Sequence, residues 1–404
     1  MSTYGSLPEG WNEVELMSLS SVITDGAHSS PKPQTQGRFM CSVKDMTYNK
    51  FDFTNVKLIS EEDYQFLVKQ GCAPQKGDLL ISKDGANCLD LLFLYEQEEE
   101  IVLLSSIAIV RLKDTVCKEY VRYFLLSPDC QFIMRNNYVS GSAIPRVVLK
   151  DFKKVPIVLP PLPEQKAIAS VLSSLDDKID LLHRQNKTLE AMAETLFRQW
   201  FIEDETIAEV VVSELIEFNP KRSLSKGTDA IYLEMAGLST QSFNATGYYR
   251  REFSSGTKFI QQDTLLARIT PCLENGKAGY VTFLRDNEVG WGSTEYIVMR
   301  PKAGLHPLMA YVLCRNQEFK DYAESCMEGS SGRQRVNVDH LKDFTIGKPS
   351  DEVIQQFNNY LESIESKLIY NSKQIQTLEN LRDTLLPKLM SGEVRVQYQI
   401  EEVA

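Results

Sequence analysis

Hydrophobic residues recur along two stretches of the chain with alternating steps of four and three residues, the spacing of a coiled-coil helix. The first series is Ile168, Leu172, Leu175, Ile179, Leu182, Asn186, Leu189, Ala193 and Leu196. The second series is Phe357, Leu361, Ile364, Leu368, Asn371, Ile375, Leu378, Arg382 and Leu385. Adding 189 to every position of the first series gives the second. We therefore expect two long helices that pair with each other as an antiparallel coiled coil.

The repeat extends upstream of these two series. Arg146-Val147 matches Arg335-Val336 with the same offset, and Gly77–Ile81 resembles Gln262–Leu266 with a slightly smaller one. The period is far too long for a solenoid. A tandem duplication of one unit, a globular domain followed by a helix, explains this layout.

Within each copy, the pattern predicts short strands first and a long helix last. The segments Val102–Leu112 and Tyr296–Arg300 are rich in strand-forming residues, and short helices are expected at Glu61–Lys69, Lys118–Leu126 and Pro307–Tyr322. The predicted fold class is therefore α/β (α+β), with two tandem mixed α/β domains that are each followed by a long helix. The expected boundaries are 1–158 for the first domain, 159–202 for the first helix, 203–347 for the second domain, 348–392 for the second helix and 393–404 for a tail.

The ends of the two helices carry prolines and bulky apolar residues. Pro163 lies in or just before the first turn of the first helix, where proline is favourable, and Pro387 is expected to end the second helix. Phe197, Trp200 and Phe201 add apolar surface of the kind that often marks a protein interface.

Each series contains one asparagine. In an antiparallel pair, Leu182 would lie opposite Asn371, with Asn186 one layer away. A buried asparagine costs stability but fixes the register and orientation of a coiled coil. Contact with a partner protein or with water is an equally good interpretation of these two residues.

Composition and charge restrict the function without defining it. The net charge of −11 favours an acidic cytoplasmic protein without a DNA role, but Lys221–Asp343 holds 16 Lys and Arg against 14 Asp and Glu. The eight cysteines form no C-x-x-C pair, so reduced thiols are expected and a zinc site is not. Without an apolar stretch of about 20 residues or a secretory signal, a cytoplasmic location is expected.

Catalytic motifs are missing from the sequence. Neither a phosphate-binding G-x-x-x-x-G-K-[ST] loop nor a G-x-S-x-G elbow occurs, and no glycine-rich loop suits S-adenosylmethionine. Asp129 followed by Glu164-x-Lys166 could hold Mg²⁺ near a phosphodiester. Because Glu365-x-Lys367 shows how easily this triplet arises, we expect no catalytic residue and no metal ligand.

Polar, glycine-rich loops occur instead at matching places in the two copies. Ser140–Arg146 matches Gly329–Arg335, and Lys83–Asn87 matches Arg268–Lys277. Small residues let a backbone approach a phosphate, and Arg, Gln and Ser suit phosphates and base edges, although any one loop could be a plain surface turn. The candidate DNA-binding residues are Asp25, Gly26, Lys44, Lys83, Asp84, Gly85, Gly141, Ser142, Arg146, Arg268, Asn275, Lys277, Ser330, Arg333, Gln334 and Arg335.

The start of the first helix resembles a known family. Leu162-Pro163-Glu164-Gln165-Lys166-Ala167-Ile168, followed by Leu172-x-x-Leu175-Asp176-x-Lys178-Ile179-Asp180, is similar to the first conserved region of the specificity subunits of type I restriction-modification enzymes. Gly292–Tyr296 and Leu385–Gly392 are similar to further pieces of that family. The resemblance covers essentially the whole chain. In the second copy Pro349–Val353 replaces the proline-rich segment, so any contact made by Pro161–Gln165 is expected to be absent or different there.

The resemblance implies two target-recognition domains that each read one half of a bipartite, asymmetric DNA site, with the helices setting the gap. It implies a non-catalytic subunit without a bound cofactor. Its partners would be two methyltransferase subunits, which use S-adenosylmethionine on adenine, and motor-nuclease subunits, which use ATP and Mg²⁺ to cleave DNA. The spacer and subunit interface would comprise Ile168, Leu172, Leu175, Ile179, Leu182, Asn186, Leu189, Phe197, Trp200, Leu361, Ile364, Leu368, Asn371, Ile375, Leu378 and Leu385.

Two other functions remain open from the residues alone. One is a coiled-coil adaptor that binds proteins through both domains and never touches DNA. The other is a DNA-recognition module of a different methylase or nuclease assembly.

Overall fold

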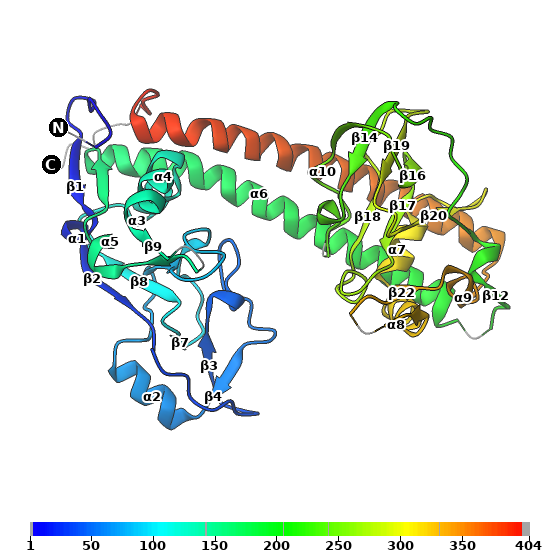
Figure 1. Ribbon diagram of the computed structural model, residues 1–404, viewed down its shortest axis with the longest axis horizontal. Helices are drawn as coiled ribbons and strands as arrows, with labels where there is room; N and C mark the ends of the chain where they lie inside the picture. The colour runs from blue at the N-terminus through cyan, green and yellow to red at the C-terminus, as the bar shows by residue number, and fades with distance from the viewer. Residues whose placement is uncertain (1–2, 142–143, 205, 241, 331, 398–404) are drawn as a thin grey trace. The chain divides into compact units, whose positions relative to one another are not determined.

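The computed structural model of the chain describes residues 3–141, 144–204, 206–240, 242–330 and 332–397 (Figure 1). Its contacts divide the chain into two units. The first unit comprises Met1–Lys178 and Leu378–Ala404, and the second comprises Ile179–Thr377. Each unit therefore contains one globular domain together with a part of both long helices.

A four-stranded antiparallel sheet forms the centre of the first unit, in the order β2 (Ser20–Asp25), β8 (Ile107–Leu112), β5 (Leu79–Ser82) and β6 (Leu92–Leu94). All four residues of β5 are buried. Leu79 and Ile81 belong to one hydrophobic core with helix α3 (Lys118–Leu126), whereas Leu80 belongs to another core with an outer sheet. A strand that is buried on both faces carries an uninterrupted apolar run, which explains the sequence of β5.

The outer sheet of the first unit has the order β4 (Lys57–Ile59), β3 (Arg38–Cys41) and β7 (Ile101–Leu103), and β3 runs parallel to β7. Helix α2 (Glu61–Lys69) packs on it through Tyr64 and Leu67. The Ser60 hydroxyl caps α2 by accepting the Asp63 N–H at 3.1 Å, and acidic residues fill the first turn. The smaller elements of this unit are β1 (Asn12–Glu15), α1 (Leu16–Leu19), η1 (Val43–Asp45), α4 (Pro128–Asn137), β9 (Val139–Ser140), β10 (Arg146–Val147), α5 (Leu149–Phe152) and β11 (Pro156–Leu159).

The second unit contains two four-stranded sheets. The central one has the order β13 (Ile216–Phe218), β20 (Tyr296–Pro301), β17 (Thr264–Ala267) and β18 (Ala278–Tyr280). The outer one has the order β15 (Tyr249–Glu252), β14 (Asp229–Leu233), β19 (Val289–Gly292) and β16 (Thr257–Ile260). The other elements are β12 (Glu209–Val211), η3 (Val212–Glu214), η4 (Met235–Gly237), α7 (Met309–Arg315), α8 (Gln317–Ser325), β21 (Met327–Glu328), β22 (Arg335–Val336), α9 (Val338–Leu341) and β23 (Thr345–Gly347).

The two units share one topology. The central order β2-β8-β5-β6 corresponds to β13-β20-β17-β18, strand by strand in chain order. In the outer sheets, the parallel pair β3 and β7 corresponds to the parallel pair β14 and β19, and β4 corresponds to β15. The internal repeat seen in the sequence is therefore a duplication of the fold.

Two long helices supply part of the core of each unit. Helix α6 spans Leu162–Phe197 and continues into a π-helical turn, η2 (Arg198–Ile202), while α10 spans Asp351–Ser391. In the first unit the start of α6 packs with the end of α10, and in the second unit the end of α6 packs with the start of α10. This antiparallel pairing confirms the predicted fold class. Every residue of the two series is buried or half-buried.

Three local predictions were wrong. Helix α10 passes through Pro387 and ends at Ser391, because proline removes a single hydrogen bond while the following Leu389 and Met390 are buried in the first core. The predicted helix over 307–322 is two helices, since the Asn316 side chain caps α8 by accepting the Phe319 N–H at 3.0 Å. The predicted strand over 102–112 is interrupted at 104–106, because β7 and β8 belong to different sheets.

The asparagines of the seam meet directly. The Asn371 side-chain amide donates to Asn186 Oδ1 at 2.8 Å, so the predicted register with Leu182 opposite Asn371 was wrong by one layer. Both asparagines are buried within the second unit. Phe197 and Phe201 are also fully buried there against Phe357, so they complete an internal core rather than an exposed patch.

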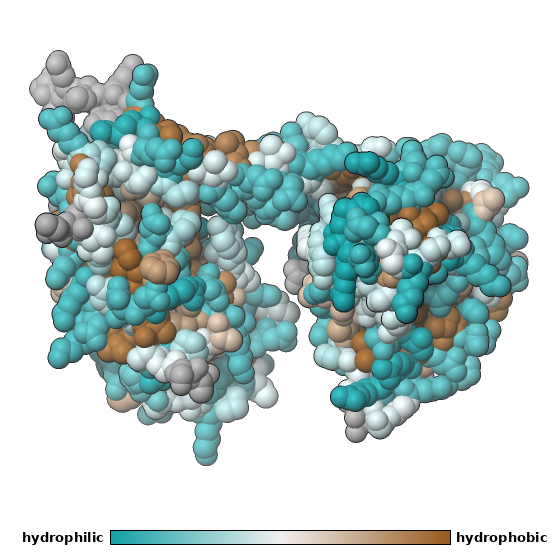
Figure 2. All heavy atoms as spheres, turned by 45° about the horizontal axis from the view of Figure 1, so that its top comes forward, coloured by the Kyte–Doolittle hydropathy of each residue, from teal (hydrophilic) through white to brown (hydrophobic). Residues whose placement is uncertain are grey.

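Hydrophilic side chains cover most of the surface of each unit seen in Figure 2, and small hydrophobic patches lie between them. Within the described ranges, no helix combines the length and the apolar character needed to cross a bilayer.

The asparagine pair predicts a non-additive mutant cycle. Asn186→Leu leaves the Asn371 amide buried without its partner, so the free energy of unfolding of the second unit should fall by about 1–3 kcal/mol. Asn186→Leu with Asn371→Leu should restore or exceed the wild-type value, because apolar seam residues pack well. Urea denaturation, followed by tryptophan fluorescence, measures this free energy. The Trp11→Phe background removes the tryptophan of the first unit, so that the signal comes from Trp200 and Trp291 of the second unit. Additive losses in the double variant would contradict the pairing.

Candidate nucleic-acid interface

In the first unit, the end of β5 meets the loop that follows α4. Lys83–Gly85 runs antiparallel beside Pro145–Val147: the Val147 N–H donates to the Lys83 carbonyl at 2.9 Å, and the Gly85 N–H donates to the Pro145 carbonyl at 3.0 Å. We call these two segments the first junction. Chain segments about 60 residues apart in the sequence are thereby held side by side.

Ion pairs set the charge of the first junction. Lys83 is buried and its Nζ lies 2.8 Å from Asp25 Oδ2. Arg146 is 61% exposed, and its Nε and Nη2 donate to the Asp84 carboxylate at 3.1 and 3.2 Å. The junction thus presents an exposed guanidinium that a carboxylate orients, with little net charge.

Two of the predicted glycines of this region are required by the backbone around them. A Cβ on Gly26 would lie 2.1 Å from the Leu103 carbonyl oxygen, so no side chain fits there. Gly141 has a φ of +89°, and a Cβ there would lie 2.4 Å from the Ile144 carbonyl oxygen. Ser142 lies outside the described residues.

The second unit repeats this arrangement with other side chains. The Val336 N–H donates to the Arg268 carbonyl at 2.8 Å, and the Thr270 N–H donates to the Gln334 carbonyl at 3.1 Å. These are the same two backbone hydrogen bonds as in the first junction. We call Arg268–Thr270 with Gln334–Val336 the second junction.

The arginine of the second junction is paired with a different carboxylate. Arg335 is 46% exposed and donates from Nε and Nη2 to both oxygens of Glu295 at 2.8 to 3.0 Å. These hydrogen bonds raise the pKa of Arg335. Glu295 precedes β20, whereas Asp84 follows β5, so the two arginines are anchored from different strands. Sequence reasoning missed the role of Glu295, since nothing local connects it with Arg335.

An open hollow of about 600 Å³ lies beside the second junction. Its lining residues are Arg268, Glu328, Gly329, Arg335, Val336, Asn337, Val338 and Asp339. Arg268 Nε is buried and has no hydrogen-bond acceptor among the described residues. An unsatisfied buried donor is unusual and suits a site that a ligand's acceptor completes.

The remaining predicted residues lie outside the junctions proper. Lys44 is exposed on η1, and Ser330 and Arg333 are exposed on the loop before β22. Asn275 is exposed on the loop between β17 and β18, where the Lys277 Nζ donates to the Met235 carbonyl at 3.2 Å. The structure therefore unites Asp25, Lys83, Asp84 and Gly85 with Arg146, and Arg268 with Gln334 and Arg335, but brings Lys44, Asn275 and Lys277 to neither group.

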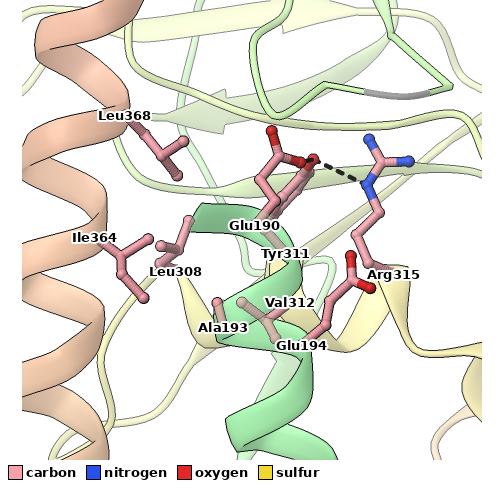
Figure 3. A pocket seen from close by; sticks show the side chains of 9 residues that line it. All are labelled: Glu190, Ala193, Glu194, Leu308, Tyr311, Val312, Arg315, Ile364 and Leu368. Atoms are coloured by element: carbon pink, nitrogen blue, oxygen red, sulfur yellow. Dashed lines mark hydrogen bonds between the residues drawn. The ribbon is translucent and has the colours of Figure 1, made fainter. Parts of the chain in front are cut away.

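A buried acidic network, unforeseen from the sequence, joins α6 to the second domain (Figure 3). The Tyr311 hydroxyl donates to Glu190 Oε2 at 2.6 Å, the Phe243 N–H donates to Glu190 Oε1 at 3.2 Å, and Arg315 Nε donates to the Tyr311 oxygen at 2.9 Å. Burial raises the pKa of Glu190. The cavity here is only about 10 Å³, too small for a ligand, so the network is a structural joint.

Arg315 extends this joint to two surface loops of the second domain. Its guanidinium also donates to the carbonyls of Thr240 and Gly276 at 3.0 and 2.9 Å and of Ser242 at 3.0 Å. Gly276 lies beside the predicted residues Asn275 and Lys277. Helix α6 is thus connected through two side chains to a loop on the domain surface.

A corresponding joint exists in the first unit. Asp176 on α6 accepts from the Tyr123 hydroxyl at 2.7 Å and from Arg382 on α10 at 3.0 Å, with Arg122 at 3.5 Å. In each unit, therefore, a carboxylate of α6 accepts a hydrogen bond from a tyrosine of the domain.

One group of side chains has the composition of a metal site. The ligand atoms of His306, Glu362 and Glu365 lie within 4.8 Å of one another. The Leu308 N–H donates to His306 Nδ1 at 3.2 Å, which places the proton of the neutral ring on Nε2, facing Glu362 at 3.1 Å. Metal binding through Nε2 would need that proton on Nδ1, so the geometry favours a hydrogen-bonded clamp between this loop and α10.

Comparisons with known proteins agree with the duplicated architecture. Residues 8–191 match the family described as "Type I restriction modification DNA specificity domain". The chain is 24% identical to the type I restriction enzyme MjaIX specificity subunit of Methanocaldococcus jannaschii, over 70% of this chain and 71% of that protein. It is 21% identical to the HindI specificity subunit of Haemophilus influenzae, over 95% and 99% of the two chains.

A solved structure shares the fold. The crystal structure of the type I restriction-modification system S subunit from M. genitalium aligns with a TM-score of 0.54 and 16% identity, over 96% of this chain and 99% of that one. The class is therefore a duplicated α/β protein built on two paired antiparallel helices. Within that class, residues 8–191 match the type I specificity domain, and the chain over most of its length is similar to type I restriction-modification specificity subunits.

The Glu190 joint predicts a position-specific loss of stability. Glu190→Ala leaves the Phe243 N–H and the Tyr311 hydroxyl without their acceptor, so the free energy of unfolding of the second unit should fall by about 2–4 kcal/mol. Glu194→Ala is the matched control, because Glu194 lines the same cavity one turn along α6 and should cost less than about 1 kcal/mol. Urea denaturation in the Trp11→Phe background measures both. Equal losses would show that Glu190 contributes only through its apolar stem.

Proposed function

We propose that the chain is the DNA-binding specificity subunit of a type I restriction-modification complex. Residues 1–158 and 203–347 act as two target-recognition domains, each reading one half of a bipartite, asymmetric site. The observation that carries this proposal is the pair of junctions, which share two backbone hydrogen bonds but differ in their side chains. Equal scaffolds with different side chains are what two different half-sites require.

The chemistry of the junctions suits DNA. Arg146 and Arg335 are exposed, and an arginine fork can bind a guanine edge or a phosphate through two hydrogen bonds. Asp84 and Glu295 hold each fork in one orientation and reduce its charge. Specific contacts therefore dominate over general attraction to the backbone, as expected for a chain whose net charge is −11.

Partner subunits supply the activities in this proposal. Methyltransferase subunits bring S-adenosylmethionine and modify adenine, and motor-nuclease subunits bring ATP and Mg²⁺ and cleave DNA in the cytoplasm. This chain contributes recognition, docking and the gap between half-sites. Phosphate contacts made by the partners would compensate for the acidity of this chain.

Methylation mapping tests the proposal. Long-read sequencing of the host with and without this gene should show adenine methylation at one split, asymmetric motif that disappears on deletion. Unchanged methylation, in cells that express the chain and its neighbours, would instead favour a protein adaptor.

Single arginine variants assign the half-sites. Arg146→Ala should impair recognition of one half-site and Arg335→Ala that of the other, each lowering methylation of the motif by roughly 5- to 150-fold, the value of one bidentate contact. Arg184→Ala is the control, since Arg184 is 70% exposed and pairs with Asp180 on the same helix. If both junction variants support wild-type methylation, the junctions are not part of the DNA interface.

The spacer role predicts a change in the gap. One heptad inserted into both α6 and α10 adds about 10 Å of helix, at about 1.5 Å per residue. The preferred gap should lengthen by about three base pairs, at about 3.4 Å each. Mapping the methylated motif of the insertion variant measures this, and an unchanged gap would show that the helices do not act as the ruler.

A further inference from the structure

The outer sheet of the second unit has an inner and an outer face that the strand register defines. Tyr232 on β14 lies opposite Tyr249 on β15 and opposite Trp291 on β19, and Trp291 lies opposite Lys258 on β16. Directly paired residues point to the same side of a sheet, and Arg251, two residues from Tyr249, points there too. We call these five residues the outer face.

The inner face is occupied by the domain core. Leu233 and Phe259, one residue away from Tyr232 and Lys258, are fully buried in a hydrophobic cluster with Leu265 and Val298 of the central sheet. Because side chains alternate along a strand, the five residues of the outer face point away from that core. Trp291 is itself buried on this side with Ala230 and Phe253, so the accessible part of the outer face lies around Tyr249 and Arg251 on β15.

Two cations lie over aromatic rings on this side of the sheet. The Arg251 guanidinium lies 5.0 Å from the centre of the Tyr232 ring and 5.6 Å from that of Trp291. The Lys258 ammonium lies 4.8 Å from the centre of the Phe253 ring, which itself packs on Trp291. Such stacking holds a cation in place without neutralising its charge.

The two neighbouring arginines of β15 differ in their ion pairs. Arg250, on the inner side, pairs with Asp229 at 2.6 Å and with Glu288 at 3.2 Å. Neither Arg251 nor Lys258 has a carboxylate within ion-pair distance among the residues that the structure describes. The nearby Glu234 carboxylate instead accepts from the Tyr249 hydroxyl at 2.8 Å, so within the described ranges the two cations of the outer face stay unpaired, unlike the arginines of the junctions.

The surroundings of the outer face are also basic and accessible. Residues 221–258 contain six Lys and Arg against three Asp and Glu, in a chain whose net charge is −11. All four residues of β15 are exposed, and β15 is an edge strand whose outer side has no neighbouring strand in the sheet. Tyr249 is 43% exposed, and the equally exposed Tyr248 stacks on Phe283 at 4.2 Å.

Unpaired positive charges beside the exposed rings of Tyr248 and Tyr249 fit a polyanion that also offers planar bases. A protein partner would favour a larger apolar patch with fewer cations. We propose that the outer face is a second DNA-contact surface of the second domain, where Arg251 and Lys258 contact phosphates and Tyr249 contacts the adjoining sugar or base. This inference rests on the proposed function and adds a site that lies in a different sheet from the second junction.

Duplex binding by the full chain, assembled with its methyltransferase partner, tests the inference. The probe is a 60-base-pair fluorescent duplex that carries the motif found by methylation mapping, with a scrambled duplex as reference. Arg251→Gln with Lys258→Gln should raise the Kd about 10-fold or more and reduce the slope of log K against log salt by about two, one for each lost phosphate contact.

Control variants separate charge from folding. Arg184→Gln with Lys348→Gln removes two exposed charges elsewhere in the second unit and should leave the Kd within twofold. Arg251→Lys with Lys258→Arg keeps both charges and should retain most of the wild-type affinity. A double glutamine variant that unfolds at the wild-type temperature yet binds weakly supports the inference.

Other outcomes distinguish the inference from the proposed function. If the double glutamine variant binds like the wild type, the outer face is not a DNA surface, while the proposed function stands. If that variant binds DNA normally but no longer assembles with the methyltransferase, the surface contacts protein and the inference is overturned. If the wild-type complex does not distinguish the motif from the scrambled duplex, the proposed function fails and this inference with it.

Discussion

A helix of 36 residues with one apolar stripe cannot bury that stripe alone, and in each unit one large core depends on the pairing of α6 with α10. In the first unit, Ile168 and Leu172 enter a core that also contains Leu389 and Met390. In the second unit, Phe197 near the end of α6 enters a core that also contains Phe357 and Leu361 near the start of α10. Each globular domain thus packs on a platform made of two helices. The first unit is complete only when the C-terminal end of the chain is present.

Polar groups inside this helical platform determine which arrangement forms. The Asn186–Asn371 hydrogen bond is satisfied in one register, and a slip by one layer would bury an amide against leucine. Glu190 in the second unit and Asp176 in the first accept hydrogen bonds from domain tyrosines, which fixes each domain on its own stretch of helix. Burying these carboxylates costs solvation energy, which is visible in the raised pKa of Glu190. These buried carboxylates therefore define where each domain attaches to the helices, without making the attachment more stable.

Duplication supplies two copies of one scaffold, and the side chains at equivalent places differ. Lys83 corresponds to Arg268, and the carboxylate that holds the exposed arginine comes from Asp84 in one copy and from Glu295 in the other. Exposed ion pairs of this kind are worth little, so a ligand can replace them at low cost. The side chains at the junctions can therefore change while the two backbone hydrogen bonds that hold each junction remain.

The sequence by itself determined the elements that depend on local periodicity. The spacing of Ile168 to Leu196 predicted α6, the local pattern predicted α2 and α3 with their observed bounds, and the offset of 189 predicted the duplicated fold. The tertiary structure alone decided which groups meet: Asn186 with Asn371, Arg335 with Glu295, and Arg251 with Tyr232. Periodicity shows which face of an element is apolar, since that follows from backbone geometry. Partners and strand register depend on contacts between distant segments, which no local pattern encodes.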